Sequence, residues 1–289
     1  MIVKFSKFEK VIFCTVIIAV SFIFAIRSEE RIVPSSSKGE TVVLPIVMYH
    51  HITQNKDKSG KYTVLDSEFV NDLKWIEKNG YTTVTVADVV DFVNGKNKLP
   101  ENPIMITFDD GFESFYKIAY PILKEKNMKA VVSVIGHTTE KYSEINDHNI
   151  NYSNLTWTQI AEMNESGLIE FQNHSYDMHK SEPKSRKGIS KLKNESAESY
   201  KEFLSADLTR LQSLFKEKCG ITPLAVAYPY GAYSKGTKEI VEACGFVCTL
   251  GCEEKTNLLK TFDKDCLFNL GRFNRESGIS TEEFFKRIA

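Results

Sequence analysis

The sequence predicts an α/β fold: an irregular or incomplete (β/α) barrel of about seven strands, preceded by an N-terminal membrane helix. Apolar runs of strand length alternate with helical patterns along the chain, which is typical of βα units around a parallel sheet. The length of 289 residues suits an α/β barrel built as one domain. Residues 41–289 contain no internal repeat and no low-complexity segment, so we treat them as one domain.

The individual elements are expected from apolar periodicity and from turn and cap residues. Short apolar runs predict strands at 43–49, 103–108, 130–135, 168–173, 224–228, 246–250 and 267–271. Helical patterns predict helices at 67–79, 86–94, 113–127, 156–166, 197–217, 235–244 and 280–288. Two of these helices begin with a capping box, Thr156 with Gln159 and Ser280 with Glu283. The polar segment 136–154 is interpreted as exposed chain or as a loop that faces a substrate.

The N-terminal part differs from the rest of the chain. Residues 1–10 form a basic lead, 11–27 a transmembrane anchor or signal peptide, and 28–40 a linker. The basic lead favours a cytoplasmic N-terminus and export of the remainder. The uncharged run is short for a membrane span, but no small-x-small cleavage site follows it, which favours an anchor over a cleaved signal. The domain is therefore expected outside the cell membrane, or secreted if the segment is cleaved.

The net charge argues against a nucleic-acid partner, and the spacing of the cysteines argues against a zinc cluster. The formal net charge is −1 and the pI is about 6.6, so nothing indicates a nucleic-acid partner. Cys244, Cys248 and Cys252 are each four residues apart and resemble a ladder of metal ligands. Gly245 and Gly251 break any helix there, so buried thiols or one or two disulfides are expected rather than a zinc cluster.

Two adjacent carboxylates, Asp109 and Asp110, end an apolar run at the exit of a predicted strand. Asp is depleted in strands and costly to bury unpaired, so two of them here indicate a cation, a proton-transfer task or both. The alternative is a solvated Asp-Gly turn. His174 and His179 follow later in the chain, and one Asp with two His makes a facial metal triad that leaves positions for water. The combination indicates a metal-dependent hydrolase.

Chemically capable side chains follow five separate predicted strands. They are His50 and His51 after 43–49, Asp109 and Asp110 after 103–108, His174 after 168–173, Tyr230 after 224–228, and Arg272 after 267–271. In (β/α) barrels the C-terminal ends of the strands converge on one face, where active sites are built. His174 and His179 are five residues apart, so they cannot share a helix face and must meet through a turn. We therefore expect one site at that face of the barrel.

Residues 107–111 and 174–179 together resemble the first and second motifs of a known family, the NodB-type polysaccharide deacetylases of carbohydrate esterase family four. The resemblance implies one catalytic base and three ligands for a divalent metal, most simply Zn²⁺. These are Asp109 as the base, and Asp110, His174 and His179 as the ligands.

Two further blocks extend this resemblance over most of residues 44–273. Residues 227–231 resemble the third motif, which lines the substrate groove, and the resemblance implies that the backbone N–H of Tyr230 faces the oxyanion. Residues 155–167 resemble the helix that precedes the second motif. The rings of Tyr230 and Tyr233 are candidates for stacking on a sugar.

The chain departs from the common motif order of the family in two places. Ala227 stands where an Arg otherwise pairs with the base, and no His lies near the C-terminus to act as the acid. A permuted branch, whose members act on surface or biofilm poly-N-acetylglucosamine, carries the acid His on an N-terminal strand, and residues 44–51 resemble that segment. The acid role therefore falls to His50, with His51 as the fallback, and Arg272 is the candidate for the missing Arg.

The resemblance implies metal-dependent removal of N-acetyl groups from an extracellular polysaccharide that contains N-acetylglucosamine. The permuted branch favours poly-N-acetylglucosamine, with peptidoglycan next. Two alternatives stay open: a non-catalytic, membrane-tethered carbohydrate-binding protein, and a metal amidohydrolase that acts on a small amide. The expected partners are the N-acetylated polysaccharide and, through the N-terminal segment, the membrane. The sequence does not indicate an oligomeric state.

Overall fold

The structure is a computed structural model that describes residues 39–180 and 186–288. The predicted basic lead, the predicted membrane segment and most of the predicted linker lie outside these residues. Within the described ranges, none of the helices has the length and hydropathy that a membrane crossing requires.

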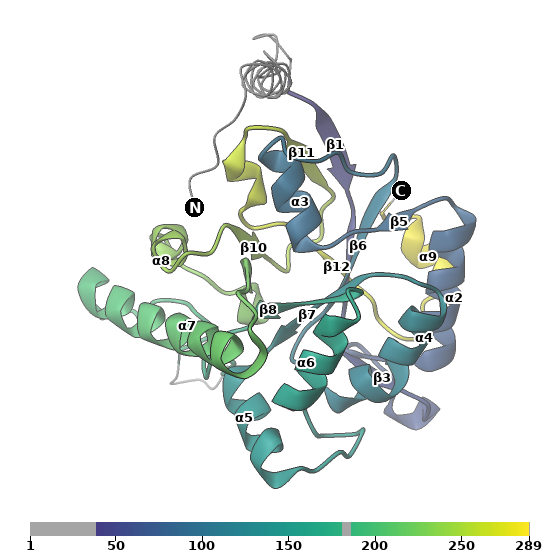
Figure 1. Ribbon diagram of the computed structural model, residues 1–289, viewed down its shortest axis with the longest axis horizontal. Helices are drawn as coiled ribbons and strands as arrows, with labels where there is room; N and C mark the ends of the chain where they lie inside the picture. The colour runs from purple at the N-terminus through teal and green to yellow at the C-terminus, as the bar shows by residue number, and fades with distance from the viewer. Residues whose placement is uncertain (1–38, 181–185, 289) are drawn as a thin grey trace, which may run out of the picture. The chain divides into compact units, whose positions relative to one another are not determined.

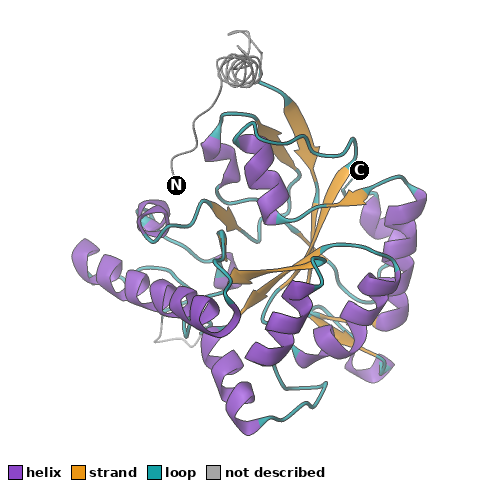
Figure 2. Ribbon diagram, viewed as in Figure 1, coloured by secondary structure: helices purple, strands orange, loops and turns teal. Residues whose placement is uncertain are grey.

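An eight-stranded parallel sheet forms the centre of the described domain, with helices around it (Figures 1 and 2). Its strands, in order across the sheet, are β10 (Cys248–Leu250), β9 (Ala225–Ala227), β8 (Ile169–Asn173), β7 (Ala130–Val134), β6 (Pro103–Phe108), β2 (Ile46–Tyr49) and β12 (Phe273–Asn274), with β5 (Thr82–Thr83) paired to the start of β6. A parallel bridge between Leu250 and Leu270 joins β10 to the segment that leads into β12. The sheet therefore curls toward closure, which fits the predicted (β/α) barrel.

Helices and two small sheets complete the domain. The helices are α2 (Asp66–Lys78), α3 (Val86–Val93), α4 (Tyr120–Glu125), α5 (Gly136–Ile145), α6 (Trp157–Glu165), α7 (Ala197–Cys219), α8 (Thr237–Ala243) and α9 (Thr281–Phe285), with a π-helical turn η2 (Phe115–Ala119) before α4 and short 3₁₀ turns η1 (Lys56–Lys58), η3 (Pro229–Gly231) and η4 (Lys264–Leu267). The small sheets pair β1 (Thr41–Leu44) with β11 (Asn257–Lys260) and β3 (His51–Thr53) with β4 (Thr63–Leu65).

Most predicted elements are present with ends shifted by a few residues, but three differ. Pro45 divides the predicted strand 43–49 into β1 and β2. The predicted strand 267–271 is wrong, because η4 covers its start, Asn269 has a φ of 57°, and pairing with β2 begins at Phe273. The segment 136–154 contains α5, which buries only three residues and so lacks an apolar stripe that periodicity could reveal.

The core positions the site, because side chains alternate across each strand. On β6, Ile104 and Ile106 belong to the hydrophobic cluster that the surrounding helices cover, whereas Met105 belongs to a second cluster with Ile46 of β2. Asp109 comes four residues after Met105, so by the same alternation its side chain points to the same side of the sheet as that of Met105. Beyond the strand ends, polar side chains on the Met105 side of the sheet form the site described next.

Candidate active site

Asp109, just after β6, and Arg272, just before β12, form a buried bidentate ion pair. Arg272 Nη1 donates to Asp109 Oδ1 and Nη2 donates to Oδ2, each at 2.8 Å. Arg272 Nε also donates to the carbonyl of Gly251 at 2.7 Å. Both side chains are almost completely buried. The sequence predicted that Arg272 follows a strand, but in the structure it lies just before β12. Its guanidinium still reaches the Asp109 carboxylate.

The charges around Asp109 keep it ionised. Burial by itself would raise the pKa of this carboxyl, but the Arg272 guanidinium and the imidazoles of His174 and His50 act in the opposite direction. The net pKa of Asp109 therefore lies well below its ordinary value. An ionised carboxylate at this position is able to accept a proton.

Asp110 occupies a left-handed backbone conformation, with a φ of 71°, and Gly111 follows with a φ of 68°. A Cβ on Gly111 would lie 2.8 Å from Val134 Cγ1, so the close approach of β7 requires glycine there. Asn154 Nδ2 donates to the carbonyl of Asp110 at 2.8 Å and so holds the turn. From this turn the Asp110 carboxylate reaches the two histidines.

His174 and His179 each present Nε2 to the same oxygen of Asp110. The distances to Asp110 Oδ1 are 3.4 Å from His174 and 3.2 Å from His179. The other ring nitrogens are engaged: His174 Nδ1 lies 2.8 Å from the carbonyl of Ala227, and His179 Nδ1 lies 3.1 Å from the Tyr230 hydroxyl. Such outer contacts fix the tautomer and orientation that a metal-binding imidazole needs.

These three residues fit a divalent cation. One ligand atom from each of Asp110, His174 and His179 lies within 4.8 Å of the others, and no other such group of His, Cys, Asp or Glu occurs in the described part of the chain. Asp110 Oδ1 is buried and makes no hydrogen bond with a described residue. Two imidazoles and one carboxylate form a donor set that suits Zn²⁺ and related metals.

His50 and His51 occupy different surroundings. Burial lowers the pKa of His50, while the charges of Asp109 and Asp110 oppose that change, so both carboxylates are near enough to influence its ring. The ring also lies 4.9 Å from that of Tyr62. The ring of His51 instead packs against Phe112 at 5.0 Å, and burial lowers its pKa too, without a contribution from either carboxylate. The structure thus brings His50, and not His51, to the cluster.

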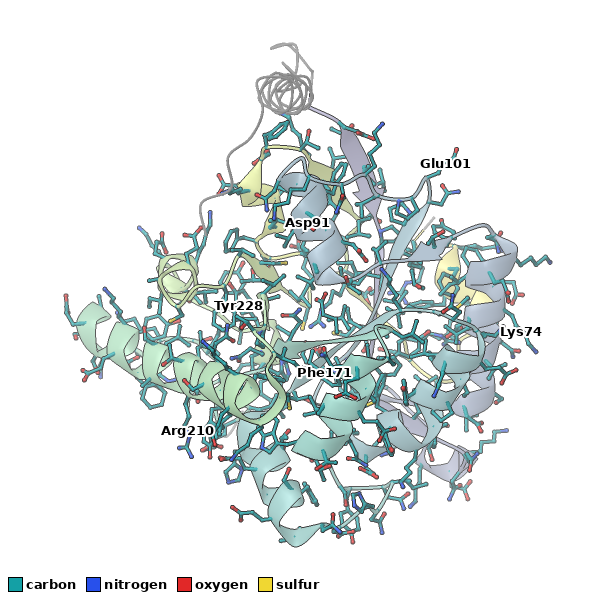
Figure 3. The ribbon with its side chains drawn as sticks, viewed as in Figure 1. Lys74, Asp91, Glu101, Phe171, Arg210 and Tyr228 are labelled. Carbon is teal, nitrogen blue, oxygen red and sulfur yellow. The ribbon has the colours of Figure 1, made fainter. Side chains whose placement is uncertain are left out.

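Tyr230 and Tyr233 are both exposed, at 41% and 48%. The Tyr230 ring lies 4.4 Å from that of His179, in addition to the hydroxyl contact, and its backbone is left-handed with a φ of 59°. The Tyr233 hydroxyl accepts from Asn269 Nδ2 at 3.1 Å. Figure 3 labels Phe171 on β8 and Tyr228 just after β9, which mark the two strands whose ends carry His174 and Tyr230. The sequence did not indicate the Tyr230–His179 contact.

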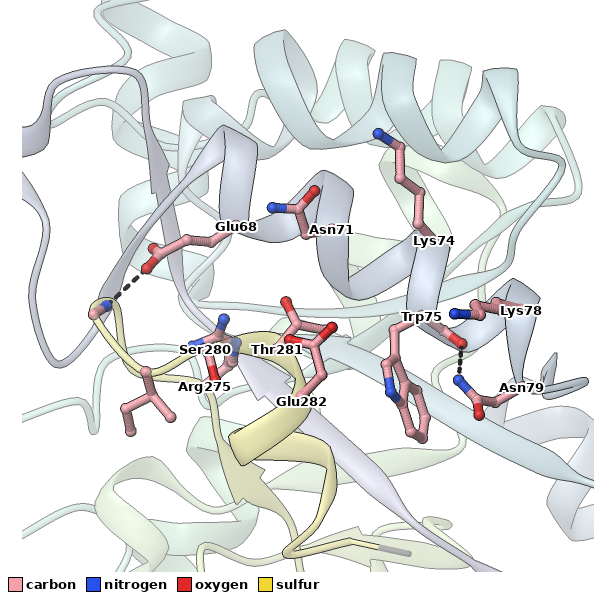
Figure 4. A pocket seen from close by; sticks show the side chains of 12 residues that line it. Glu68, Asn71, Lys74, Trp75, Lys78, Asn79, Arg275, Ser280, Thr281 and Glu282 are labelled. Carbon is pink, nitrogen blue, oxygen red and sulfur yellow. Dashed lines mark hydrogen bonds between the residues drawn. The ribbon is translucent and has the colours of Figure 1, made fainter.

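Other groups with chemical potential lie apart from this cluster. The five described cysteines are all unpaired, with Cys248 buried, so of the two expected alternatives they are thiols rather than disulfides. A pocket of about 740 Å³ between α2 and α9, lined by residues that include Trp75 and Arg275, contains none of the candidate residues (Figure 4). Within the described residues, the ends of β2, β6, β8 and β9 therefore concentrate the chemistry at one place.

Comparison with known proteins yields one family. The family model described as polysaccharide deacetylase matches residues 96–249. A poly-beta-1,6-N-acetyl-D-glucosamine N-deacetylase of Staphylococcus aureus (strain MRSA252) is 30% identical over 195 residues, which are 67% of this chain and 62% of that protein. This chain thus spans less than two thirds of that relative's length.

Two solved structures share the fold. The de-N-acetylase from Aggregatibacter actinomycetemcomitans has a TM-score of 0.72 and 25% identity, covering 86% of this chain and 98% of that one. IcaB from Ammonifex degensii has a TM-score of 0.66 and 27% identity, covering 80% of this chain and 90% of that one.

Proposed function

We propose that this chain, which belongs to the polysaccharide deacetylase family, hydrolyses N-acetyl groups of an extracellular polysaccharide that contains N-acetylglucosamine. The name of the Staphylococcus aureus relative favours poly-N-acetylglucosamine as the polymer. Peptidoglycan presents the same acetamide group and is the next candidate. One observation carries the proposal: a carboxylate and two imidazoles meet within 4.8 Å, beside a second buried carboxylate paired with Arg272.

Asp110, His174 and His179 would hold a divalent cation, most simply Zn²⁺. When bound, such an ion polarises the acetyl carbonyl and raises the acidity of water. Both oxygens of Asp109 accept from Arg272, and each keeps a second lone pair that can receive a proton. Asp109 therefore stays available as the base that accepts a proton from the attacking water, and Arg272 holds it in place.

The remaining steps need an acid, an oxyanion donor and a surface for the sugar. The charges of Asp109 and Asp110 act on His50, and this residue is assigned to protonate the departing amine. The backbone N–H of Tyr230 is assigned to the oxyanion. The exposed rings of Tyr230 and Tyr233 offer surfaces on which a sugar ring can stack.

Acetate release tests this function. N-acetylglucosamine oligomers of rising length, poly-N-acetylglucosamine and peptidoglycan are incubated with the protein, with and without a chelator. We expect release that rises with oligomer length, stops with chelator and returns with Zn²⁺. Asp110→Ala should lose both metal and activity, because it removes one of the three ligands.

The alternatives predict other outcomes in the same assay. A carbohydrate-binding protein would bind the polymer and release no acetate from the zinc-loaded chain, which would contradict the proposal. A small-amide hydrolase would release acetate from the monomer at least as fast as from the longer oligomers.

We also propose that residues 11–27 keep this domain at the outer side of the cell membrane, or direct its secretion if they are cleaved. The proposal is supported by the uncharged run that follows a basic lead. Fractionation of cells that produce the full chain tests it, and recovery of the intact chain from the cytosol would contradict it.

A further inference from the structure

We propose that Asp207, on α7, is a positioning residue that holds the turn between the two metal-binding histidines and so sets the affinity of the site for its cation. This inference rests on the proposed function, because it takes Asp110, His174 and His179 as metal ligands. Asp207 touches none of these ligands and lies outside the motifs that carry the family resemblance.

The turn needs support from outside. It leaves β8 at Asn173, carries His174 at its start and His179 at its end, and contains Ser175 with a φ of 68°. A left-handed conformation is unfavourable for a residue other than glycine, so surrounding contacts must maintain it. If they did not, the two imidazoles would lose the spacing that a single cation requires.

Asp207 supplies the central contact. Its Oδ1 accepts from the backbone N–H of Tyr176 at 2.7 Å, and its Oδ2 accepts from that of Asp177 at 2.9 Å. One carboxylate thus binds two consecutive amides in the middle of the turn. Hydrogen bonds to a charged acceptor are about twice as strong as those between neutral groups.

Two local contacts occupy the amides on either side. Asn173 Oδ1 accepts from the N–H of Ser175 at 2.8 Å, and Ser175 Oγ accepts from the N–H of Met178 at 3.1 Å. Every amide from 175 to 178 therefore has a side-chain acceptor. Only the acceptor on α7 comes from a distant part of the chain, so it alone ties the turn to the rest of the domain through these amides.

The carbonyl side of the turn is held by α5. The backbone N–H of Gly136 donates to the carbonyl of Ser175 at 3.1 Å, and that of His137 donates to the carbonyl of Tyr176 at 2.8 Å. The guanidinium of Arg210, labelled in Figure 3, lies 3.5 Å from the centre of the Tyr176 ring. The turn is therefore fixed between two helices, and the Asp207 carboxylate is the charged group that binds its backbone amides.

The chain offers a matched pair of variants. Asp207→Asn removes one acceptor, because an amide nitrogen facing a backbone N–H cannot accept. The side chain borders a pocket of about 780 Å³, so the amide has room. Asp177→Asn removes the same charge from the same turn, but its carboxylate is 44% exposed and pairs with Lys180 rather than with the backbone.

The experiment measures Zn²⁺ affinity of the full chain by competition with a chromophoric chelator, together with the visible absorption spectrum of the Co²⁺-loaded protein. We expect Asp207→Asn to bind Zn²⁺ about 10-fold more weakly and to change the Co²⁺ spectrum. Groups that contact metal ligands directly have effects of about 10- to 100-fold, and Asp207 acts on the ligands only through the turn, so its effect should lie at the lower end of this range. Asp177→Asn should retain the wild-type spectrum and stay within about threefold of its affinity.

Equal affinity of Asp207→Asn and the wild type, or equal weakening by both variants, would overturn the inference. Absence of metal uptake by the wild type would instead overturn the proposed function, and this inference with it. Should Asp207→Asn not fold, amide hydrogen exchange in the wild type decides. Slow exchange of the Tyr176 and Asp177 amides supports their hydrogen bonds to Asp207, and exchange as fast as in an exposed loop refutes them.

Discussion

The turns that follow β6 and β8 contribute to the same cluster but are built differently. After β6, Asp109 and Asp110 are adjacent, so one peptide unit sets their relative positions, and contacts from Arg272 and Asn154 complete the turn. After β8, four residues separate the histidines, and α5, α7 and the segment after β9 all contact the turn. Both turns use contacts that are remote in sequence, but only in the longer β8 turn do those contacts also set the spacing between two of the candidate ligands.

The largest effect is expected from Asp109, the proposed base in the β6 turn. Asp109→Asn keeps the shape of the side chain and removes the base, so turnover should fall about 10³-fold while zinc content stays near that of the wild type. Steady-state acetate release and metal analysis of the same sample measure both. His174→Ala is the counterpart in the β8 turn and should lose metal as well as activity. Near-normal turnover of Asp109→Asn would show that the base lies elsewhere.

The next effect concerns the buried pair that supports the β6 turn. Arg272→Ala leaves the Asp109 carboxylate buried without its partner, and we expect the free energy of unfolding to fall by about 3 kcal/mol or more. Arg287→Ala is the control, because Arg287 and Glu254 are both more than a third exposed and their pair is worth at most about 1 kcal/mol. Urea unfolding of the metal-free proteins measures both values. Equal losses would mean that the buried pair contributes no more than a surface pair.

A smaller effect is expected where α5 meets the β8 turn. A Cβ on Gly136 would lie 2.7 Å from Tyr176 Cδ2 and 3.2 Å from Tyr176 Cα, so Gly136→Ala must displace the turn. We expect a loss of about 2 kcal/mol of stability, together with weaker zinc binding. Gly60→Ala is the control, since nothing lies within 4 Å of the added carbon and no positive φ is involved. If both variants bind zinc like the wild type, the β8 turn tolerates displacement and the contrast between the turns is lost.

The smallest effect concerns pH and the residue that packs against the β6 turn. Burial lowers the pKa of His51 in the folded chain, so the unfolded chain binds more protons between that pKa and the ordinary value of about 6.5. Stability present above about pH 6.5 is therefore lost as the pH falls through the folded pKa. Thermal unfolding of the metal-free chain at pH 7.5 and 5.5 should show a loss of a few degrees that His51→Gln reduces.

The control for that experiment is His137→Gln, because His137 is exposed. Its replacement should leave the difference between the two pH values unchanged. A His51→Gln variant with the same pH dependence as the wild type would show that burial of this ring does not couple folding to protons.

Sequence patterns predicted what depends on neighbours along the chain. Strand β6 and the paired carboxylates at its end follow from an apolar run closed by Asp109 and Asp110, and side-chain alternation explains why Asp109 points inward. The same patterns failed at 267–271, because the chain there turns through a left-handed Asn269 before it pairs with β2. They also passed over α5, whose place is determined by its contacts with the turn rather than by an apolar stripe.

The sequence by itself determined the kinds of groups available to this site and the strands that carry most of them, because strand periodicity and adjacent residues act over a few positions. Only the tertiary structure decided which partners those groups meet: Arg272 with Asp109, Tyr230 with His179, and Asp207 with the turn between the histidines. Those pairs are separated by 30 to 163 residues. Their contacts exist only after the sheet has curled and the helices have packed on it, which no local pattern encodes.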